Sequence, residues 1–318
     1  MTTAAEFGPR GWTPDRLPDL DGKNFVVTGG NSGIGFEAAR LLGGKRARVT
    51  ILTRGEEKGA SAVAALRSAA PGGFFDYVPL FLDDLSSVRL AVQTVRARLQ
   101  KIDGLINNAG IMMVPERRLT ADGFEMQFGV NHLGHFVFAG LLSDLVENAG
   151  GRFVAVSSVA HRFGKLNFAD LMWKTDYSST GAYAQSKLAN LVYALELNRR
   201  LEKSGCRARS YACHPGYSDT NLQTTGPSKA FGALSKPFNA MLAQKAAKGA
   251  IPTVLCAAGK DAKPGHYYGP KGFYEMKGPV RQAQISDPAR SERNAVRLWE
   301  ISEKLTGVRW PILKEAHV

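Results

Sequence analysis

The stretch NFVVTGGNSGIG, residues 24–35, contains the strongest indication of the fold. Its first five residues are a short β-rich apolar run, as in a buried strand. The glycines that follow lead into a helical pattern beginning at Gly33. Glycines lack a Cβ and let the backbone approach a pyrophosphate, and the helix N-terminus offers free N–H groups and positive partial charge. A strand, a glycine-rich turn and a helix in this order predict a dinucleotide-binding site.

From this stretch toward the C-terminus, short β-rich runs alternate with longer helical patterns. Strands are expected at 24–28, 48–53, 77–82, 104–107, 152–157 and 207–213, and helices at 33–42, 56–69, 87–99, 130–146, 181–203 and 289–305. This alternation predicts an α/β fold with a parallel sheet covered by helices on both faces. We expect one domain over residues 21–318, preceded by an N-terminal arm over residues 1–20.

Two segments fall outside the alternation. Residues 218–249 are rich in Gly, Ser, Thr and Pro, and several of their apolar residues recur at helical spacing. We expect either a mobile lid over a substrate or a surface helix with one face in the core. Residues 269–284 are expected to be irregular and to lead into the terminal helix.

The composition is that of an ordinary globular protein, with 318 residues, 44% hydrophobic and 22% charged. The chain has no run of 18 uninterrupted apolar residues, and its first 20 residues lack the pattern of a signal peptide. These observations predict a cytoplasmic protein without a membrane span. Three cysteines form no CxxC pair and six scattered histidines form no HExxH motif, so we expect neither a disulfide nor a metal site.

The net charge of +13 is compatible with several kinds of binding partner, including nucleic acid, an acidic membrane surface and an anionic substrate. The basic residues are spread along the chain, and no zinc-finger or RNA-binding signature is present. We therefore expect no nucleic-acid partner. Most of the excess charge is expected on a solvated surface, with a smaller share attracting a phosphate-rich small molecule.

Tyr183 and Lys187 stand four residues apart in an expected helix and therefore lie on one face. A fixed ammonium beside a phenol favours the phenolate and lowers a pKa that is otherwise about 10. Such a phenol can donate or accept a proton during turnover. The same spacing occurs on many solvated helices, so the pair alone does not identify a site.

The end of the second expected strand bears on the choice of cofactor. An acidic residue there favours the ribose 2′-hydroxyl of NAD, whereas an arginine suits the 2′-phosphate of NADP. This strand ends Leu52-Thr53-Arg54, and the first carboxylate follows only at Glu56. The guanidinium of Arg54 can bind a phosphate through two hydrogen bonds, with Lys58 nearby. The sequence therefore predicts NADP as the cofactor.

Six motifs together resemble the short-chain dehydrogenase/reductase family, over about residues 17–305. They are TGGNSGIG (28–35), NNAG (107–110), NHLGH (131–135), VSS (156–158), YAQSK (183–187) and HPG (214–216). The resemblance implies a Rossmann-like doubly wound parallel sheet in three layers, with a substrate lid and a C-terminal extension. NHLGHF, SSVAH, SKLAN and GHYYGP are most similar to the retinol-dehydrogenase-like branch and its bacterial relatives.

The resemblance implies four catalytic residues. Tyr183 is the expected general acid or base at the substrate oxygen, and Lys187 is expected to lower its pKa and to hold the nicotinamide ribose. Ser158, the second serine of its pair, is expected to hydrogen-bond the same oxygen. Asn131 is expected to hold a water that links Lys187 to solvent. Ser158, His161 and Tyr183 form the expected substrate-binding set.

The resemblance also implies the residues that bind the cofactor. They are Gly29, Asn31, Ser32, Gly33, Ile34, Gly35, Arg54, Asn108, Ala109, Gly110, Tyr183, Lys187, Pro215, Gly216 and Thr220. One departure concerns the adenine, near which many relatives carry an aspartate after the third strand. Phe81 takes that position here, so either Phe81 packs beside the adenine or Asp83 takes over.

Apolar residues that follow the strand ends, among them Met112, Phe163 and Met172, suggest a roomy apolar pocket. We therefore predict an NADP(H)-dependent oxidoreductase that transfers hydride between the nicotinamide and a bulky hydrophobic carbonyl or alcohol. One alternative is reduction of a carbon–carbon double bond, as in protochlorophyllide reductases. Another is a non-catalytic NADP-binding regulator, although the intact set of four catalytic residues argues against it. Formation of a homo-oligomer stays open.

Overall fold

The computed structural model describes residues 7–216 and 246–313. These residues form one sheet of eight strands in the order β3-β2-β1-β4-β5-β6-β7-β8. The strands are β1 (Asn24–Thr28), β2 (Arg48–Thr53), β3 (Phe74–Pro79), β4 (Gly104–Asn107), β5 (Arg152–Val156), β6 (Arg209–Cys213), β7 (Tyr267–Pro270) and β8 (Val280–Gln282). All neighbouring pairs are parallel except β7 with β8. The predicted α/β fold with a parallel sheet is confirmed.

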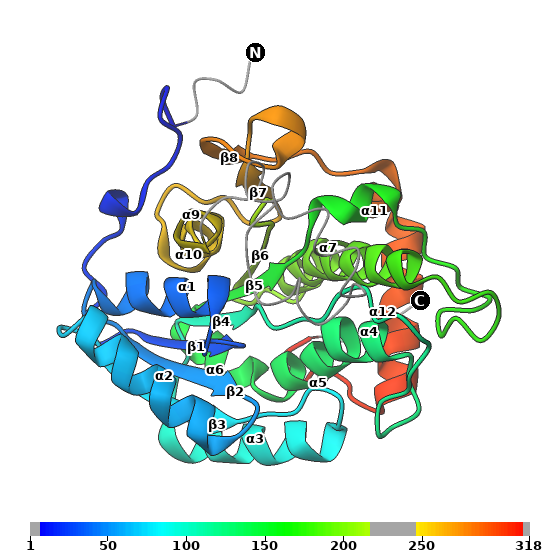
Figure 1. Cartoon of the computed structure of the whole chain (residues 1–318), viewed down its shortest axis with the longest axis horizontal. Helices are drawn as coiled ribbons and strands as arrows, with labels where there is room; N and C mark the ends of the chain where they lie inside the picture. The colour runs from blue at the N-terminus through cyan, green and yellow to red at the C-terminus, as the bar shows by residue number, and fades with distance from the viewer. Residues whose placement is uncertain (1–6, 217–245, 314–318) are drawn as a thin grey trace.

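Helices cover both faces of the sheet (Figure 1). The longer ones are α1 (Gly33–Gly43), α2 (Glu56–Ala69), α3 (Leu85–Arg98), α5 (Gly134–Leu141), α6 (Ser143–Ala149), α7 (Ser179–Lys203), α10 (Ile251–Ala258) and α12 (Glu292–Thr306). Short ones are η2 (Pro14–Arg16), α4 (Met126–Phe128), η3 (Gly129–Leu133), η4 (Val159–Phe163), α9 (Ala246–Gly249), η6 (Phe273–Glu275) and α11 (Asp287–Arg290). Each face therefore has its own hydrophobic core.

The two cores follow from the alternation of side chains along the strands. Phe25 and Val27 of β1 pack with α1, α2 and α10, whereas Val26 packs with α3, α5, α7 and α12. The chain order of the strands reverses between β1 and β4, since β2 and β3 lie on one side of β1 and β4 lies on the other. In sheets of this kind, ligands bind in the crevice outside the carboxyl ends of the strands at this reversal.

Several predicted boundaries differ from the structure. The third strand lies at Phe74–Pro79 rather than at 77–82, and its pairing with β2 ends where Thr53 lies opposite Pro79. The single helix expected over 130–146 is divided into η3, α5 and α6. Leu142, with φ of −108°, separates α5 from α6. Across this residue, the hydroxyl of Ser143 donates a hydrogen bond to the carbonyl of Gly140.

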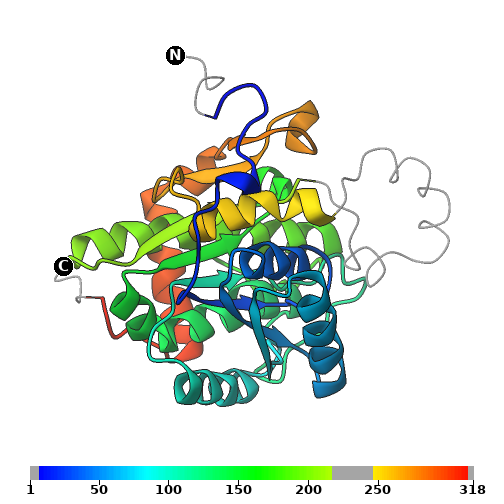
Figure 2. The same ribbon diagram turned by 90° about the vertical axis from the view of Figure 1, so that its left-hand side faces the viewer.

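The prediction of an irregular segment at 269–284 is wrong. Its ends form the antiparallel pair β7 and β8, which extends the sheet (Figure 2). In the described part of the N-terminal arm, from residue 7 onward, Trp12 lies beside β8 and pairs with Val280. The Trp12 ring is buried and its Nε1 donates to Asp261 at 2.9 Å. Of the expected lid at 218–249, only Ala246–Gly249 belongs to the described residues, as α9.

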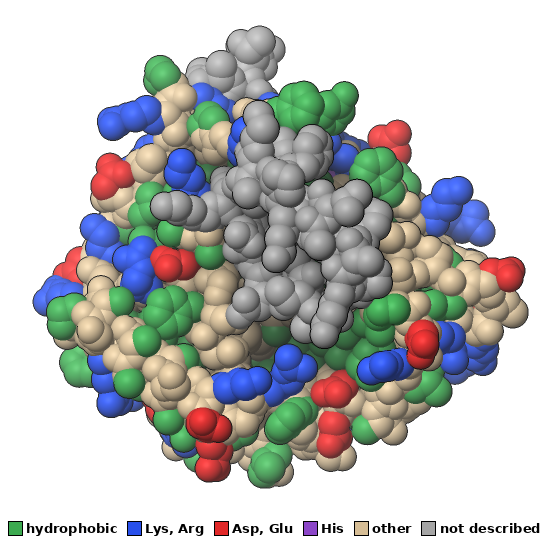
Figure 3. Space-filling view, in the orientation of Figure 1, with side chains coloured by type: hydrophobic (Ala, Val, Ile, Leu, Met, Phe, Trp, Pro, Cys, Tyr) green, Lys and Arg blue, Asp and Glu red, His purple; other side chains and the backbone are tan. Residues whose placement is uncertain are grey.

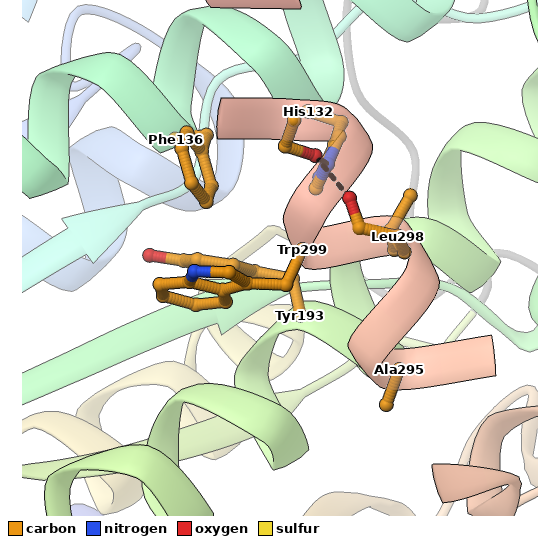
Figure 4. Close-up of a pocket in the computed structure, with 7 residues that line it drawn as sticks. His132, Phe136, Tyr193, Ala295, Leu298 and Trp299 are labelled. Carbon is orange, nitrogen blue, oxygen red and sulfur yellow. Dashed lines mark hydrogen bonds between the residues drawn. The ribbon is translucent and has the colours of Figure 1, made fainter. Parts of the chain in front are cut away.

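Helix α12 packs against α7, and Figure 4 shows side chains of the two helices at this contact. The ring of Trp299 stacks on that of Tyr193 with an interplanar angle of 12°. Nε2 of His132 lies 2.9 Å from the hydroxyl oxygen of Ser302. The remaining space between these side chains is too small to hold a water molecule. This contact is therefore packed core, and it fixes the helix that carries Tyr183.

Candidate active site

The glycine-rich turn between β1 and α1 has the geometry of a phosphate-binding loop. Gly29 and Gly33 have φ of +66° and +56°, a conformation that favours glycine. A Cβ on Gly35 would lie 2.4 Å from the carbonyl oxygen of Gly29, so the close approach needs glycine at this position. Ser32 precedes α1 but its side chain accepts no hydrogen bond from the helix. The first N–H groups of α1 are thus without a side-chain cap, and the turn fits a pyrophosphate.

A buried network joins this turn to β4 and to the helix that carries Asn131. The hydroxyl oxygen of Thr28 accepts hydrogen bonds from the N–H groups of Asn108 and Ala109, both at 2.9 Å. The same oxygen lies 2.8 Å from Nε2 of His135, whose Nδ1 lies 3.0 Å from the carbonyl oxygen of Asn131. A carbonyl only accepts, so Nδ1 carries the proton and Nε2 accepts from Thr28.

His135 is neutral at physiological pH because burial lowers its pKa to about 4. His135 is the last residue of the NHLGH motif and is not among the predicted site residues. In the structure it fixes the backbone of Asn131 relative to the glycine turn. The sequence signal for this role is the spacing, because a histidine four residues after an asparagine in a helix lies on the same face.

Asn131 lies in η3, a π-helical turn, a feature frequent at functional sites. Its side-chain amide donates to the carbonyl of Ile111 and to the hydroxyl of Ser186, each at 2.9 Å. Its side-chain oxygen accepts from the N–H of Ile111 at 2.8 Å. A Cβ on Gly110 would lie 3.1 Å from that oxygen and 3.3 Å from Nζ of Lys187. Gly110 therefore lets Asn131 and Lys187 come close together.

Tyr183 and Lys187 lie one turn apart near the start of α7, which Ser178 caps by accepting from the N–H of Gly181. Nζ of Lys187 is 5.9 Å from the centre of the Tyr183 ring and donates to the carbonyl of Val156 at 3.2 Å. Burial lowers the pKa of Lys187 to about 8. The helix thus brings the two side chains to the carboxyl end of β5.

The structure differs from the expectation that Lys187 lowers the pKa of Tyr183. Burial raises the pKa of Tyr183 above its ordinary value, and a hydrogen bond with Ser158 opposes the rise only in part. The phenol therefore keeps its proton at neutral pH in the structure. A protonated phenol is suited to donate a proton to a substrate oxygen.

The two adjacent serines after β5 differ in their contacts. The hydroxyl of Ser157 is buried and donates to the backbone carbonyl of Lys187 at 2.6 Å, so it is engaged in holding α7. Ser158 is only half-buried, and its hydroxyl oxygen accepts from the N–H of Ala160 at 3.2 Å. The Ser158 hydroxyl also hydrogen-bonds with Tyr183, whereas that of Ser157 is bound to the backbone of α7, which favours Ser158 over Ser157 as the candidate catalytic serine.

The other expected site residues are placed as follows. Arg54 is exposed at the end of β2, and Phe81 is also exposed after β3. Pro215 and Gly216 follow β6, while Thr220 lies outside the described residues. His161 is fully buried, and its Nδ1 donates to the backbone carbonyl of Ser158 at 2.7 Å. His161 thus contacts the backbone of Ser158, the candidate catalytic serine.

Charge is dispersed over the face that looks onto the carboxyl ends of the strands. In Figure 3, Lys and Arg side chains lie at separate places around this face, with acidic side chains among them. Within residues 7–216 and 246–313, no cluster of His, Cys, Asp or Glu is arranged to hold a metal ion. In the same residues, none of the helices has the length and apolar character needed to cross a membrane.

Comparison with known proteins agrees with this geometry. The family model described as short chain dehydrogenase matches residues 23–230. The chain belongs to the short-chain dehydrogenase/reductase family. Members are oxidoreductases that act on alcohols or carbonyls with a nicotinamide cofactor. The free N–H groups of α1 and the close approach at Gly29 and Gly35 fit such a cofactor.

Individual relatives place the chain more closely within this family. Retinol dehydrogenase 12 from Mus musculus is 38% identical over 294 residues, covering 92% of this chain and 88% of that protein. Polyprenol dehydrogenase from Danio rerio is 37% identical over 302 residues, covering 92% and 90%. The crystal structure of an uncharacterized protein from Mycobacterium paratuberculosis is 39% identical, with a TM-score of 0.79 over 95% of this chain and 99% of that one. The predicted retinol-dehydrogenase-like character is confirmed.

Proposed function

We propose that this short-chain dehydrogenase/reductase is NADP(H)-dependent and that Tyr183 is its general acid or base. Its substrate is a bulky hydrophobic carbonyl or the corresponding alcohol. The observation that carries the proposal is the arrangement at one edge of the sheet. Tyr183, Lys187 and Ser158 meet there beside the glycine turn, and Gly110 brings Asn131 to Lys187. This is a set of proton donors next to a site for a dinucleotide.

The nicotinamide, when bound, donates or accepts the hydride. In the direction of reduction, Tyr183 donates its proton to the carbonyl oxygen, and its raised pKa keeps that proton in place beforehand. Ser158 donates a hydrogen bond to the same oxygen, which stabilises the developing negative charge. Lys187, with a pKa of about 8, is suited to return a proton toward Tyr183 near neutral pH. Asn131 holds a water that continues this path to solvent.

The names of the relatives support the choice of substrate class. Retinol and polyprenols are long apolar alcohols, and relatives named for them cover about nine tenths of this chain. We propose that long, unsaturated apolar alcohols and aldehydes are substrates here as well. Among the expected pocket residues, Phe163 is 82% exposed, whereas Met172 packs against the core. Only some of the apolar residues that the sequence predicts to line the substrate pocket are therefore exposed to a substrate.

A substrate panel tests the proposed function. Purified protein is mixed with NADPH and with long apolar aldehydes, ketones or conjugated alkenes, and the loss of nicotinamide absorbance is followed. We expect turnover of aldehydes or ketones. Turnover of the alkenes alone contradicts the proposal and favours reduction of carbon–carbon bonds. Tight binding of NADPH with no turnover contradicts it in favour of a non-catalytic regulator.

Arg54 tests the choice of cofactor. Its exposed guanidinium at the end of β2 is positioned to bind the 2′-phosphate of NADP, which NAD lacks. We expect Arg54→Ala to raise the KM for NADPH by about 10- to 100-fold, the loss of one to two charge-assisted hydrogen bonds. The KM for NADH should stay within about threefold of the wild-type value.

A matched control for Arg54 is available on the same strand. Arg48 is exposed at the opposite end of β2, away from the carboxyl edge of the sheet. Arg48→Ala removes the same charge and should leave both KM values unchanged. An equal effect of the two substitutions on NADPH, or no effect of Arg54→Ala, contradicts the assignment of NADP.

A further inference from the structure

We propose that Glu275 is a positioning residue that joins the loop of Ser158 to the loop of Pro215 and Gly216. The proposal rests on the oxidoreductase function proposed above, in which these two loops flank the reacting atoms. Glu275 lies in η6, in the turn between β7 and β8, and belongs to neither loop. It lies beyond the residues 23–230 that match the family model.

The carboxylate of Glu275 contacts both loops at once. Its side chain is buried, with the residue 6% exposed. Oε2 accepts a hydrogen bond from Nη2 of Arg162 at 2.5 Å and lies 3.5 Å from Nε2 of His214. Oε1 accepts from the N–H of Gln284 at 3.1 Å, which anchors the carboxylate within its own hairpin. One acidic group therefore bridges the turn after β5 and the turn after β6.

On the first loop, Arg162 stands in η4 directly beside His161. The backbone carbonyl of Ser158 accepts from Nδ1 of His161 at 2.7 Å and from the hydroxyl of Tyr267 at 3.3 Å. The rings of His161 and Tyr267 meet edge to face, with centres 5.3 Å apart. The ion pair of Arg162 with Glu275 holds this turn against the β7–β8 hairpin. The β7–β8 hairpin thereby fixes the backbone that orients the Ser158 hydroxyl.

On the second loop, the tautomer of His214 follows from its contacts. The N–H of Gly216 donates to Nδ1 of His214 at 3.2 Å, so Nδ1 is an acceptor and the proton is on Nε2. Nε2 therefore carries a proton and lies 3.5 Å from Oε2 of Glu275, a polar contact longer than an ordinary hydrogen bond. The ring lies directly on β7, since a Cβ at Gly269 would come 1.9 Å from Nε2. Glycine at 269 is required for this contact.

The backbone at Glu275 is strained in a way that fits a specific role. Tyr274 and Glu275 have φ of +48° and +59°, in the left-handed region that non-glycine residues rarely adopt. Such conformations persist where the surrounding contacts determine them, and they concentrate at functional sites. Burial raises the pKa of Glu275, but His214 and Arg162 outweigh it, so that the pKa lies below its ordinary value. Glu275 is therefore ionised when it makes these contacts.

Glu275→Gln tests the bridge because it keeps the size of the side chain and removes its charge. We expect kcat to fall by about 10- to 100-fold, since small misplacements of reacting groups have effects of this size. The Kd for NADPH should change less than kcat, because the glycine turn expected to hold the phosphates belongs to neither loop and only Pro215 and Gly216 are expected to contact the cofactor. The stoichiometry of NADPH binding gives the fraction of folded sites, so that a loss of folded protein is not counted as a loss of kcat.

Amide hydrogen exchange provides a second readout that does not depend on activity. In Glu275→Gln, amides of residues 157–164 and of His214 and Gly216 should exchange faster than in the wild type. Asp144→Asn is the control, since it breaks an ion pair of 2.6 Å with Arg96 far from both loops. Should Glu275→Gln fail to fold, Arg162→Met breaks the same contact from the other side and takes its place.

Unchanged exchange in either loop, or an unchanged kcat in an active enzyme, overturns the proposal. Faster exchange in both loops together with the loss of kcat supports it. If the wild-type protein turns over none of the carbonyl substrates, the proposed function fails. The exchange measurement still decides whether Glu275 joins the two loops.

Discussion

Tyr183→Phe should lower kcat by about 10²–10⁴-fold, the usual contribution of a well-placed general acid. The substitution removes only the phenolic oxygen, and the ring keeps its place on α7 above Lys187. The Kd for NADPH should stay within about threefold, since most of the cofactor contacts lie elsewhere. Initial rates followed at the nicotinamide absorbance, with cofactor binding measured by fluorescence, separate the two effects.

A second tyrosine on the same helix serves as the control. Tyr193 is buried, and its hydroxyl has no hydrogen-bond partner among the described residues. Tyr193→Phe makes the same chemical change two turns or more further along α7 and should leave kcat unchanged. If Tyr183→Phe were as active as Tyr193→Phe, the assignment of Tyr183 as the general acid would be wrong.

Lys187→Met should abolish turnover and yet raise the thermal stability of the protein without cofactor. Lys187 is only 5% exposed, and burial lowers its pKa from 10.5 to about 8. At neutral pH the folded protein must therefore keep a buried ammonium that the unfolded chain exposes to water. The cost is on the order of 3 kcal/mol, since each pKa unit corresponds to about 1.4 kcal/mol. The carbonyl of Val156 keeps a second donor, Nδ2 of Asn190 at 3.3 Å.

The pH dependence of this stabilisation has a defined sign. A base whose pKa is lowered on folding binds fewer protons in the folded state, so the wild type gains stability as the pH rises from about 8 to 10.5. The difference in free energy of unfolding between Lys187→Met and wild type should be largest below pH 8. It should shrink above that pH.

The control for Lys187 is an exposed lysine on the same helix. Lys203→Met in the last turn of α7 should change neither activity nor the pH dependence of unfolding. Denaturant unfolding at pH 7 and pH 10 measures the effect. A destabilised Lys187→Met protein, or a difference that grows with pH, would contradict the account of the buried ammonium.

The parts of the fold that local sequence determines could be predicted. β1, β2 and β4 have the predicted bounds because each is a short apolar run ended by a turn. The glycine turn and the Tyr183–Lys187 pair are local as well, since their geometry depends on residues at most a few positions apart. These elements place the dinucleotide turn and the proton donors at the same edge of the sheet.

The parts that depend on distant partners could not be predicted. β8 has only three residues, and it is a strand because β7 and Trp12 lie on either side of it. The π-helical turn at Asn131 is held by hydrogen bonds with Ile111 and Ser186, which lie 20 and 55 positions away in the chain. Glu275 lies in a segment without periodicity, and only the folded chain shows that its carboxylate contacts two loops of the candidate active site.

The docking of the N-terminal arm has a consequence for how the protein is made. Trp12 contacts Asp261, a residue 249 positions later in the chain, and pairs with Val280. During synthesis at about 5–20 residues per second, the arm therefore waits roughly 12–50 s for its partners to leave the ribosome. Until then Phe7, Trp12 and Leu17, which are buried in the finished protein, remain exposed to solvent and to chaperones. Trp12 thus reaches its native contacts only after Asp261 and Val280 have been synthesised.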